Sequence, residues 1–527
     1  MEEKNIEATH WADQIAKKVI EERKKDIYTV AAGITPSGTI HIGNFREIIT
    51  VDLVHRALKS LGKKVRFIYS WDEFDVFRKV PADAPEKELL LKYLRYPITE
   101  VPDTYDHKHK SYAEHNEKEV EDTIPKVDIN PEFIYQAKKY RNCDYAEEIK
   151  YVLDHKKEIK LILDKFRTEE HNENWWPVSV FCDKCKTDET KILDWDGKYN
   201  LTYECKCGHK ETFDFRKKGI AKLPWRLDWP MRWKYEDVDF EPAGKEHSTS
   251  GGSRDTGNEI FKALYKKEPP IALKYDFITI KGTGGKISKS KGNVVSLGDT
   301  LAIYEPDIVR YLFASTRPDT EFAISFDLDA IKIYEDFDRC ERIYYGKEDA
   351  EGKEKIKQKR IYELSVVKLS KDMPFQPSFR HLTNIYQTYS GDMNKVKEYY
   401  KKDLKNKSDE EKLKIRIECV KNWLDKYAPE DFKYKVQDTV SEETKSKLND
   451  TQKKALKLVA EKLSKKDYKE EELAQEFMNI MNETGLKMPE FFKACYNVLL
   501  NKDKGPKLAS FVLIIGKKKI IDLFEQI

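Results

Sequence analysis

The sequence predicts an α/β nucleotide-binding fold that is interrupted by a cysteine-rich insertion and followed by an all-helical C-terminal region. A strand–helix–strand pattern occupies residues 26–71, and the same pattern returns over residues 239–281. From residue 296 onward the apolar residues follow helical spacing, and no strand pattern returns through residue 527. A chain of 527 residues is too long for one hydrophobic core, so we expect several folding units.

The first half of the α/β fold is marked by two β-rich runs around one helix. Residues 26–33 and 64–71 are the runs, and residues 45–61 carry apolar side chains at helical spacing. The first strand and the helix are joined by ITPSGTIHIGNFRE, residues 34–47. The start of a helix presents unpaired N–H groups and a partial positive charge, so this junction is expected to bind the phosphates of a nucleotide.

The second half repeats the pattern after a long interruption. Residues 239–247, DFEPAGKEH, end a predicted strand, residues 255–265 read as a helix, and residues 271–281 read as one further strand. Residues 81–215 break this rhythm with proline-rich turns, a helix predicted over 145–166, and a group of cysteines. We therefore expect an insertion that splits the nucleotide fold.

A glycine- and lysine-rich loop follows the second half. It reads GTGGKISKSKGN, residues 282–293, and places Lys286, Lys289 and Lys291 beside two serines. Mobile ammonium groups can close on the charge that grows on a leaving pyrophosphate. Such a loop alone is more often a solvated turn, but its pairing with His41-Ile42-Gly43-Asn44 on the other half of the fold favours a catalytic role.

Composition excludes a membrane-spanning protein and indicates a polar surface. Charged residues make up 36% of the chain, the mean hydropathy is −0.75, and apolar runs such as residues 511–515 are far shorter than the roughly 20 residues of a membrane span. Near the N-terminus, Ile6, Trp11, Ile15 and Val19 are spaced as in an amphipathic helix, and a secretory apolar core is missing. We expect a cytoplasmic protein.

The charge is unevenly distributed along the chain. Residues 346–527 carry a net charge of +8 and the remainder carries −5. A basic tail on a mildly acidic front indicates that a polyanion binds the tail while the chemistry takes place at the front. The alternative is that lysines simply decorate exposed helices.

Four of the eight cysteines have the spacing of a structural zinc site. Cys182 and Cys185 lie in FCDKC, and Cys205 and Cys207 lie in ECKCGHK about twenty residues later. The fourth ligand is Cys207 or His209, and the glycine turn after Cys207 favours the cysteine. The alternative is a set of buried free thiols; disulfides are not expected in a cytoplasmic chain.

These motifs resemble those of the class I aminoacyl-tRNA synthetases, whose signatures are usually written HIGH and KMSKS. Here they read HIGN (41–44) and KISKS (286–290), so Asn44 and Ile287 depart from the family pattern. The whole chain is similar to the class I lysyl-tRNA synthetases, through the following stretches: ITPSGTIHIGNFRE, WDEFDVFRKVP, NWWP, DWPMRW, DFEPAGKEH and GPKLASF.

The resemblance implies a Rossmann-like catalytic domain that uses ATP and Mg²⁺. His41 and Asn44 would donate hydrogen bonds to the phosphates, while Lys286 and Lys289 would hold the β- and γ-phosphates. Those four are the expected catalytic residues, and the expected ATP site consists of Pro36, His41, Gly43, Asn44, Lys286, Ser288 and Lys289. For His41 and Asn44 the alternative role is that of a helix cap.

The resemblance also implies contacts with the amino acid lysine. An ammonium group away from water needs a carboxylate or aligned carbonyls and can lie on an aromatic ring. The expected contacts are Gly33, Thr35, Asp72, Trp225, His247 and Tyr275. Glu73, Asp75 and Asp228 are further candidate acids, and Trp229 and Trp233 are more often core residues than ligands.

The helical tail is expected to bind the anticodon of tRNA(Lys) rather than DNA. Single-stranded bases stack on aromatic rings, with cations along the backbone. Candidate contacts, each of which is more often a core residue, are Phe375, Phe379, Arg380, Trp423 and Tyr427.

The resemblance divides the chain into five parts and leaves two rival functions. The parts are the first catalytic half (1–80), the zinc-containing insertion (81–215), the second catalytic half with the KISKS loop (216–295), a helical stem-contact region (296–345) and a helical anticodon-binding domain (346–527). The rivals are a class I synthetase for arginine or glutamate and an inactive tRNA-binding paralogue.

Overall fold

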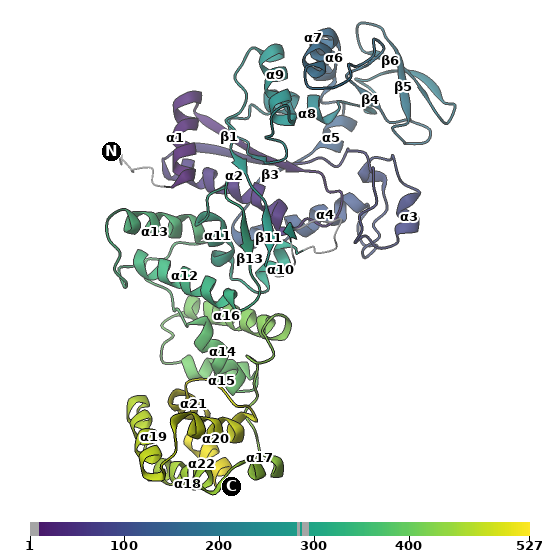
Figure 1. The fold of residues 1–527 in the computed structure, drawn as a ribbon. Helices are drawn as coiled ribbons and strands as arrows, with labels where there is room; N and C mark the ends of the chain where they lie inside the picture. The colour runs from purple at the N-terminus through teal and green to yellow at the C-terminus, as the bar shows by residue number, and fades with distance from the viewer. Residues whose placement is uncertain (1–9, 282–284, 287–294) are drawn as a thin grey trace. The chain divides into compact units, whose positions relative to one another are not determined.

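The computed structural model describes residues 10–281, 285–286 and 295–527 in two compact units (Figure 1). The first unit holds the sheet and comprises residues up to 301, 306–325 and 340–369. The second unit is helical and comprises residues 302–305, 326–339 and 370–527. Each unit has its own buried apolar core.

The first unit is built on a parallel sheet. The strands β1 (Ile27–Ile34), β2 (Lys64–Trp71) and β3 (Glu132–Tyr135) pair in the order β1-β2-β3. On the other side of β1, parallel bridges join Val30 to Phe240 and Phe240 to Ile271, beside the pair β9 (Ala243–Gly244) and β10 (Lys274–Tyr275). The predicted parallel sheet is confirmed, whereas β3 lies inside the stretch that the sequence reads as an interruption.

Helices cover this sheet and fix its strand ends. The helix α2 (Ile42–Ser60) connects β1 to β2, and α1 (Trp11–Arg23) packs against it. The predicted helix over 45–61 therefore begins three residues earlier, because His41 caps it. Helices α8 (Trp225–Tyr235) and α9 (Ser253–Tyr265) pack against each other before β10.

The predicted strand over 271–281 is interrupted. It contains the bridge at Ile271, β10, and then β11 (Ile278–Ile280), with Asp276 and Phe277 between β10 and β11. The strand β11 pairs antiparallel with β12 (Gly285–Lys286) and parallel with β13 (Phe322–Ile324). The expectation that no strand returns after residue 296 is wrong, because β13 completes this small sheet.

The chain between β2 and α8 carries short helices and two small antiparallel sheets. The predicted helix over 145–166 is two helices that meet at His155, α6 (Ala146–Asp154) and α7 (Lys156–Asp164). The sheets are β5-β6-β7 and β4-β8. The remaining elements are α3 (Lys87–Leu91), α4 (Tyr112–Glu121), α5 (Gln136–Arg141), β4 (Ser179–Val180), β5 (Thr190–Trp195), β6 (Asn200–Cys205), β7 (Lys210–Asp214) and β8 (Ala221–Lys222), with 3₁₀ turns at Ile98–Glu100 and Ile124–Val127.

Apart from β13, the regular elements described after residue 296 are helices, as predicted. In the first unit these are α10 (Leu297–Leu301), α11 (Pro306–Ala314) and α13 (Gly352–Ser365), while α12 (Asp329–Tyr344) runs across the boundary between the units. Buried Arg310 of α11 donates to the Leu364 carbonyl of α13 at 3.0 Å and to Asp52 of α2 at 2.6 Å. These contacts attach α13 to the sheet unit.

The second unit is helical throughout its described residues. Residues 436–524 form an apolar core of their own, which includes Phe477, Phe491 and Phe511. Its helices are α14 (Phe379–Thr388), α15 (Met393–Tyr400), α16 (Lys407–Lys426), α17 (Glu442–Lys447), α18 (Asp450–Lys465), α19 (Glu470–Thr484), α20 (Met488–Leu500), α21 (Leu508–Ile515) and α22 (Lys517–Phe524). None of the helices in the described part of the chain combines the length and apolar character that a bilayer crossing requires.

Candidate functional site

The HIGN turn forms a doubly hydrogen-bonded helix start. His41 Nδ1 accepts the Asn44 N–H at 3.2 Å, and Asn44 Oδ1 accepts the His41 N–H at 3.2 Å. This reciprocal pair is a capping box, so both side chains are held in place at the N-terminus of α2. A Cβ atom on Gly43 would lie 2.8 Å from His41 Nδ1, so a larger residue there would displace the imidazole from its capping position.

The structure describes the residues at both ends of the KISKS loop. On one side, Lys286 pairs through its backbone with Thr279 in the β11–β12 hairpin. On the other side, the Ile42 N–H donates to the Val295 carbonyl at 2.7 Å, and His41 forms an antiparallel bridge with Ser296. The chain after the KISKS loop thus returns directly to the HIGN turn, although Ser288 and Lys289 lie outside the described residues.

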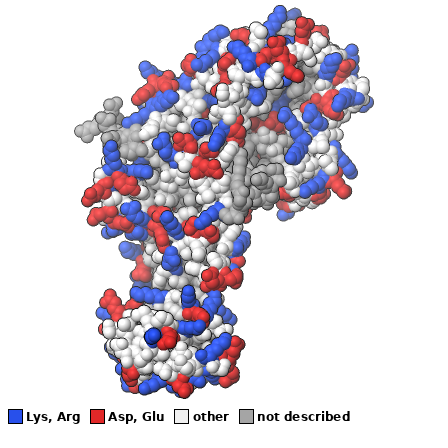
Figure 2. Space-filling view, viewed as in Figure 1, with Lys and Arg blue, Asp and Glu red and all other residues white. Residues whose placement is uncertain are grey.

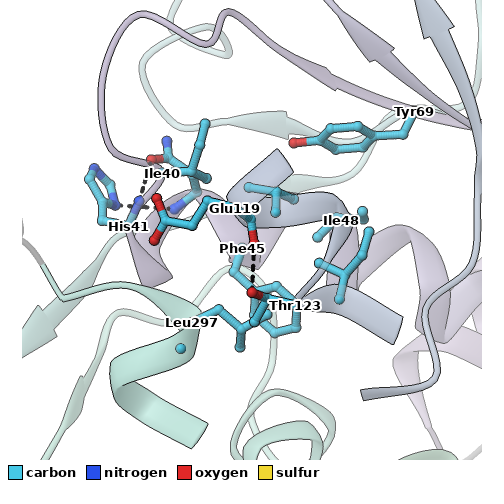
Figure 3. A pocket seen from close by; sticks show the side chains of 12 residues that line it. Ile40, His41, Phe45, Ile48, Tyr69, Glu119, Thr123 and Leu297 are labelled. Carbon is cyan, nitrogen blue, oxygen red and sulfur yellow. Dashed lines mark hydrogen bonds between the residues drawn. The ribbon is translucent and has the colours of Figure 1, made fainter. Parts of the chain in front are cut away.

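A small pocket lies under the start of α2 (Figure 3). It encloses about 20 Å³, which is room for about one water molecule, and His41, Phe45, Tyr69 and Glu119 are among the lining residues. Its wall is mostly apolar, so we do not regard it as the nucleotide site. The residues that line this pocket include members of α2, α4 and α10, so these three helices meet beneath the turn.

The half-buried Glu47 joins two of the predicted lysine contacts. Glu47 of α2 accepts the Gly33 N–H at 3.1 Å and the Tyr275 hydroxyl at 2.7 Å. Burial raises the pKa of Glu47 to about 8, although these two hydrogen bonds act in the opposite direction. Gly33 is the penultimate residue of β1 and Tyr275 ends β10, so Glu47 lies at the carboxyl edge of the parallel sheet, where such sheets bind their ligands.

Asp72 is already paired with a cation. Arg232 of α8 donates to Asp72 from Nη1 at 2.6 Å and from Nη2 at 3.4 Å, and its Nε lies 3.4 Å from Asp228. Burial raises the pKa of Asp72 to about 6; Arg232 lowers it, while Asp75 raises it further. A lysine ammonium would therefore have to compete with Arg232 for this carboxylate.

The neighbouring Asp75 is also paired. Its Oδ2 accepts the Thr35 hydroxyl at 2.9 Å, and its Oδ1 is hydrogen-bonded to Lys222 Nζ. Burial opposes ionisation of Asp75, but Lys222, Thr35 and Arg232 together outweigh it and lower the pKa of Asp75. Thr35 is thus held by a buried ion pair. Glu73, by contrast, accepts the backbone N–H groups of Gln136 and Ala137 and has a structural role.

An aromatic wall adjoins the sheet edge. The ring of Trp225 stacks on Trp229 with centroids 5.5 Å apart and meets the His247 ring edge-on at 5.4 Å. His247 Nδ1 lies 3.0 Å from the Ser253 hydroxyl, at the start of α9. Trp229 and Trp233 are buried, as expected for core residues, whereas Trp225 and His247 are half-buried.

The structure brings the four predicted cysteines together. One Sγ atom from each of Cys182, Cys185, Cys205 and Cys207 lies within 4.8 Å of all the others. Cys182 and Cys207 are 3.8 Å apart at sulfur, and Cys185 and Cys205 are 3.5 Å apart. His209 instead lies 3.4 Å from Glu211, outside this group, so Cys207 is the fourth member.

The aromatic candidates of the helical unit belong largely to its core. Phe379 and Trp423 are fully buried: Phe379 stacks on Tyr334 at 3.9 Å, and the Trp423 indole N–H donates to the Phe326 carbonyl at 2.9 Å. Rings without an exposed face cannot stack on a base, so we withdraw these two residues as anticodon contacts.

The other three candidates differ in exposure. Phe375 is half-buried against Tyr400, at a centroid distance of 5.5 Å. Arg380 is exposed and pairs with Glu335 at 3.2 Å, and Tyr427 is 36% exposed and stacks on Phe326. Arg380 and Tyr427 therefore remain accessible to a ligand.

Sequence reasoning missed three residues at the sheet edge. Glu47, Lys222 and Arg232 contact predicted site residues, but their partners lie 14 to 228 positions away along the chain. Glu47 lies in ITPSGTIHIGNFRE and Arg232 in DWPMRW, but nothing local in these stretches shows which residues they contact. The one available signal was the excess of acids in WDEFDVFR, which requires cations from another part of the chain.

Comparisons with known proteins agree along the whole chain. Residues 9–368 match the family model described as tRNA synthetases class I (K), and residues 393–524 match an anticodon binding domain. A protein named Lysine--tRNA ligase from Borrelia garinii subsp. bavariensis is 52% identical over 99% of each chain. Proteins of the same name are 46% identical in Treponema pallidum, over 97% of each chain, and 40% identical in Pyrococcus furiosus, over 97% of this chain and 98% of that one.

Proposed function

Because the chain belongs to the class I (K) family of tRNA synthetases, we propose that it is a lysine–tRNA ligase. It activates L-lysine with ATP to form lysyl-adenylate and pyrophosphate, and it transfers the lysyl group to the terminal adenosine of tRNA(Lys). We base this conclusion on sequence identity: proteins that bear this name are 40% to 52% identical to this chain over nearly its full length.

The nucleotide part of the proposal rests on the junction between the HIGN turn and the KISKS loop. ATP would lie with its phosphates over the N-terminus of α2, near Pro36 and Gly43, where His41 and Asn44 are held by the capping box. Lys286, Ser288 and Lys289 would approach the phosphates from the loop that returns to Ile42. Mg²⁺ would neutralise phosphate charge when bound.

The reaction needs no protein nucleophile, so catalysis depends mainly on positioning the reacting groups. One lysine carboxylate oxygen attacks the α-phosphorus in line, the bond to the β-phosphate bridging oxygen breaks, and pyrophosphate leaves with its electron pair. A ribose hydroxyl of the tRNA adenosine, which in this class we take to be the 2′ oxygen, then attacks the lysyl carbonyl and releases AMP. The protein's contribution is to hold these groups and stabilise the growing charge.

We assign the lysine substrate to the sheet edge around Glu47. Gly33, Thr35, Trp225, His247 and Tyr275 are half-buried there and would surround the amino acid. Asp72 stays in the wall of the pocket, but Arg232 already balances its charge. Glu47 accepts its hydrogen bonds from two neutral donors, the Gly33 N–H and the Tyr275 hydroxyl, so its carboxylate is the better partner for an ammonium group.

The experiment that tests this function is amino-acid-dependent exchange between pyrophosphate and ATP. Exchange with lysine, and not with arginine or glutamate, is expected from full-length enzyme assayed with and without tRNA(Lys). Exchange with arginine or glutamate alone would assign the chain to another class I synthetase. Binding of tRNA without any exchange would identify an inactive paralogue.

We propose that the four cysteines bind a structural Zn²⁺. Two thiolates bound to one tetrahedral zinc at about 2.3 Å lie roughly 3.8 Å apart, and the sulfur separations of 3.5 and 3.8 Å are close to that. The cluster links the turn after β4 to the end of β6, so Cys182→Ser or chelation should lower thermal stability and expose residues 178–215 to protease. Elemental analysis that finds no zinc in carefully purified protein would remove this site.

We propose that the helical unit binds tRNA(Lys), and that its boundary lies near residue 370 rather than at 346. Arg310 and Arg56 donate to the carbonyls of Leu364 and Val366, which attaches residues 346–369 to the sheet unit. The other divisions, at residues 80, 215 and 295, we keep. Since residues 370–527 carry a net charge of +6, the affinity for tRNA should fall steeply with salt through counterion release, whereas lysine activation without tRNA should not. Equal salt dependence of both would contradict this assignment.

A further inference from the structure

A buried arginine of α2 binds the backbone of two segments that are distant in sequence. Arg46 is 2% exposed and lies between Asn44 of the HIGN turn and Glu47. Its guanidinium group donates five hydrogen bonds, with lengths from 2.7 to 3.1 Å, to main-chain carbonyls. The acceptors are the carbonyls of Asp276, Phe277, Arg317, Pro318 and Thr320. One side chain of the helix that begins at the HIGN turn therefore holds both segments.

The two terminal nitrogen atoms of Arg46 divide these carbonyls between the segments. Nη1 donates to Asp276 at 2.8 Å and to Phe277 at 3.0 Å, whereas Nη2 donates to the three carbonyls within residues 317–320. The Asp276 N–H donates in turn to the Pro318 carbonyl at 2.8 Å. The planar fork of a guanidinium group suits this arrangement, and the compact ammonium of a lysine lacks such a fork.

Arg46 is committed to the geometry of the main chain rather than to a carboxylate. In the described part of the chain, its hydrogen-bond acceptors are all carbonyl groups, and its Cζ lies 5.1 Å from the centre of the Phe322 ring. Burial lowers the pKa of Arg46 to about 10, while nearby acids such as Asp276 and Asp319 oppose this shift. The group therefore stays charged at neutral pH and attracts the negative ends of the carbonyl dipoles.

The segment that Nη1 holds connects the proposed lysine pocket to the KISKS loop. Residues 276–277 directly follow Tyr275, whose hydroxyl donates to Glu47 at 2.7 Å. The same two residues directly precede β11, which contacts α2 and pairs with β12, where the KISKS motif begins at Lys286 (Figure 1). Arg46 thus holds the base of the β11–β12 hairpin against the helix of the HIGN turn.

The segment that Nη2 holds leads into the other neighbour of β11. Residues 317–320 lie just before β13, which pairs with β11 in parallel. Because parallel strands begin at the same edge, both strands start beside the guanidinium group. The carbonyls at this edge need hydrogen-bond donors, and Arg46 provides them for both strands at once. The small sheet is therefore anchored to α2 at its starting edge by one side chain.

We propose that Arg46 is a positioning residue for lysine activation, which sets the β11–β12 hairpin and its Lys286 against the HIGN turn. This inference rests on the proposed function and adds a residue that acts only through main-chain carbonyls. A displacement of about 1 Å between reacting groups can slow a reaction by about 10². Loss of the guanidinium fork should therefore slow adenylate formation, while Glu47 continues to bind the lysine substrate.

Lysine-dependent exchange between pyrophosphate and ATP in Arg46→Lys tests the proposal. This variant keeps the charge but loses the fork, so the maximal rate should fall about tenfold to hundredfold, with a change below about threefold in the KM for lysine. The matched control is Arg56→Lys on the same helix, because Arg56 donates to the Val366 carbonyl at 2.7 Å and not to the hairpin. The control should keep the wild-type rate. Equal rates in the two variants, measured where both are folded, would overturn the proposal.

A double-variant cycle with Lys286→Ala separates positioning from a general loss of structure. If Arg46 acts through the hairpin, its substitution should cost little once Lys286 is absent. The double variant should then be clearly faster than the product of the two single losses predicts. A general structural defect would act independently of Lys286, so losses that simply multiply would refute the positioning role.

Hydrogen–deuterium exchange gives a readout that does not depend on the proposed function. Amides within residues 276–281 should exchange hydrogen faster in Arg46→Lys than in the wild type or in Arg56→Lys, because the base of the hairpin has lost its anchor. Unchanged amide exchange would overturn the role of Arg46 alone. A wild type that shows no lysine-dependent pyrophosphate exchange would instead overturn the proposed function, and with it the catalytic part of this inference.

Discussion

The sheet edge of the first unit and the helices of residues 436–527 use charge in opposite ways. At the sheet edge, Asp72, Asp75, Lys222 and Arg232 form ion pairs that are largely withdrawn from water. In residues 436–527 the buried polar residues are Thr444 and Asn497, and charged side chains stay at the surface. Figure 2 shows Lys and Arg interspersed with Asp and Glu over the visible face.

This difference follows from the size of the ligand that each region is proposed to bind. A small charged amino acid is discriminated best where few water molecules compete, because charges attract more strongly at low dielectric. A folded tRNA presents many phosphates at once, so exposed lysines suffice and no charge needs to be buried. The comparison predicts large effects for substitutions at the sheet edge and small effects at the helical surface.

Breaking a buried ion pair should have the largest effect. Arg232→Met leaves Asp72 and Asp228 without their shared cation, and we expect a loss of about 3 to 5 kcal/mol in the free energy of unfolding. Chemical denaturation followed by tryptophan fluorescence measures this loss. A second substitution, Asp72→Asn, should recover part of it, since the uncompensated charge is then removed.

The loss in Arg232→Met should also depend on pH. The pKa of Asp72 is raised to about 6 in the folded protein, so its contribution to stability is present below its unfolded pKa near 4 and is lost as the pH rises through 6. Removing Arg232 raises that pKa further. The variant should therefore be destabilised more at pH 8 than at pH 5, and a loss independent of pH would show that packing dominates.

Substitution of Lys289 is expected to affect the reaction rate rather than stability. If Lys289 stabilises the phosphates in the transition state, Lys289→Ala should lower the rate of lysine-dependent pyrophosphate exchange by about 10² or more while the KM for lysine stays nearly unchanged. The matched control is Lys291→Ala on the same loop. A large rise in KM for lysine with an unaltered maximal rate would assign Lys289 to another role.

These predictions concern residues that sequence analysis identified to different degrees. The HIGN turn, β1, α2 and β2 could be predicted because periodicity and turn residues are local signals. The cysteine pairs could be grouped because their spacing alone defines a zinc-type cluster. In contrast, β3 and β13 were missed, since strands of four and three residues carry too little alternation to stand out from loops.

The carboxylate that we propose for the lysine pocket could not be predicted for a different reason. Glu47 becomes a pocket residue only because Gly33 and Tyr275 converge on it, 14 residues before and 228 residues after it in the chain. Asp72 was the more obvious candidate from local sequence, yet its charge is taken up by Arg232, 160 residues away. Pairing across the sheet edge is a property of the folded chain.

Removing the Glu47 charge should have an intermediate effect that is specific to lysine. Glu47→Gln keeps the size of the side chain but loses its attraction to an ammonium group, so the KM for lysine should rise about tenfold to fiftyfold with little change in the KM for ATP. In the wild type the KM for lysine should fall as the pH rises through about 8, because the carboxyl group then ionises.

The pH dependence separates a binding role for Glu47 from a structural one. Glu47→Gln should abolish the fall in KM between pH 7 and pH 9, and Tyr275→Phe should retain it, because the phenylalanine variant still has the carboxyl group. If both variants raise the KM equally and keep the wild-type pH profile, Glu47 only supports Tyr275 and the lysine ammonium has another partner.

The smallest effect is expected from a surface pair in the helical region. Glu461 and Lys465 of α18 lie 2.5 Å apart at Oε1 and Nζ, but their side chains are 52% and 63% exposed. Water and salt screen such a pair, and ordering two long side chains offsets much of the attraction. Glu461→Ala, Lys465→Ala and the double variant should therefore unfold at the wild-type temperature within error, and lysine activation should not change. Thermal unfolding of the wild type and the three variants measures the coupling energy between Glu461 and Lys465. A tenfold loss of tRNA charging in Lys465→Ala alone, with normal activation and stability, would place this lysine in the tRNA-binding surface and show that the helical region also holds charges with large individual effects.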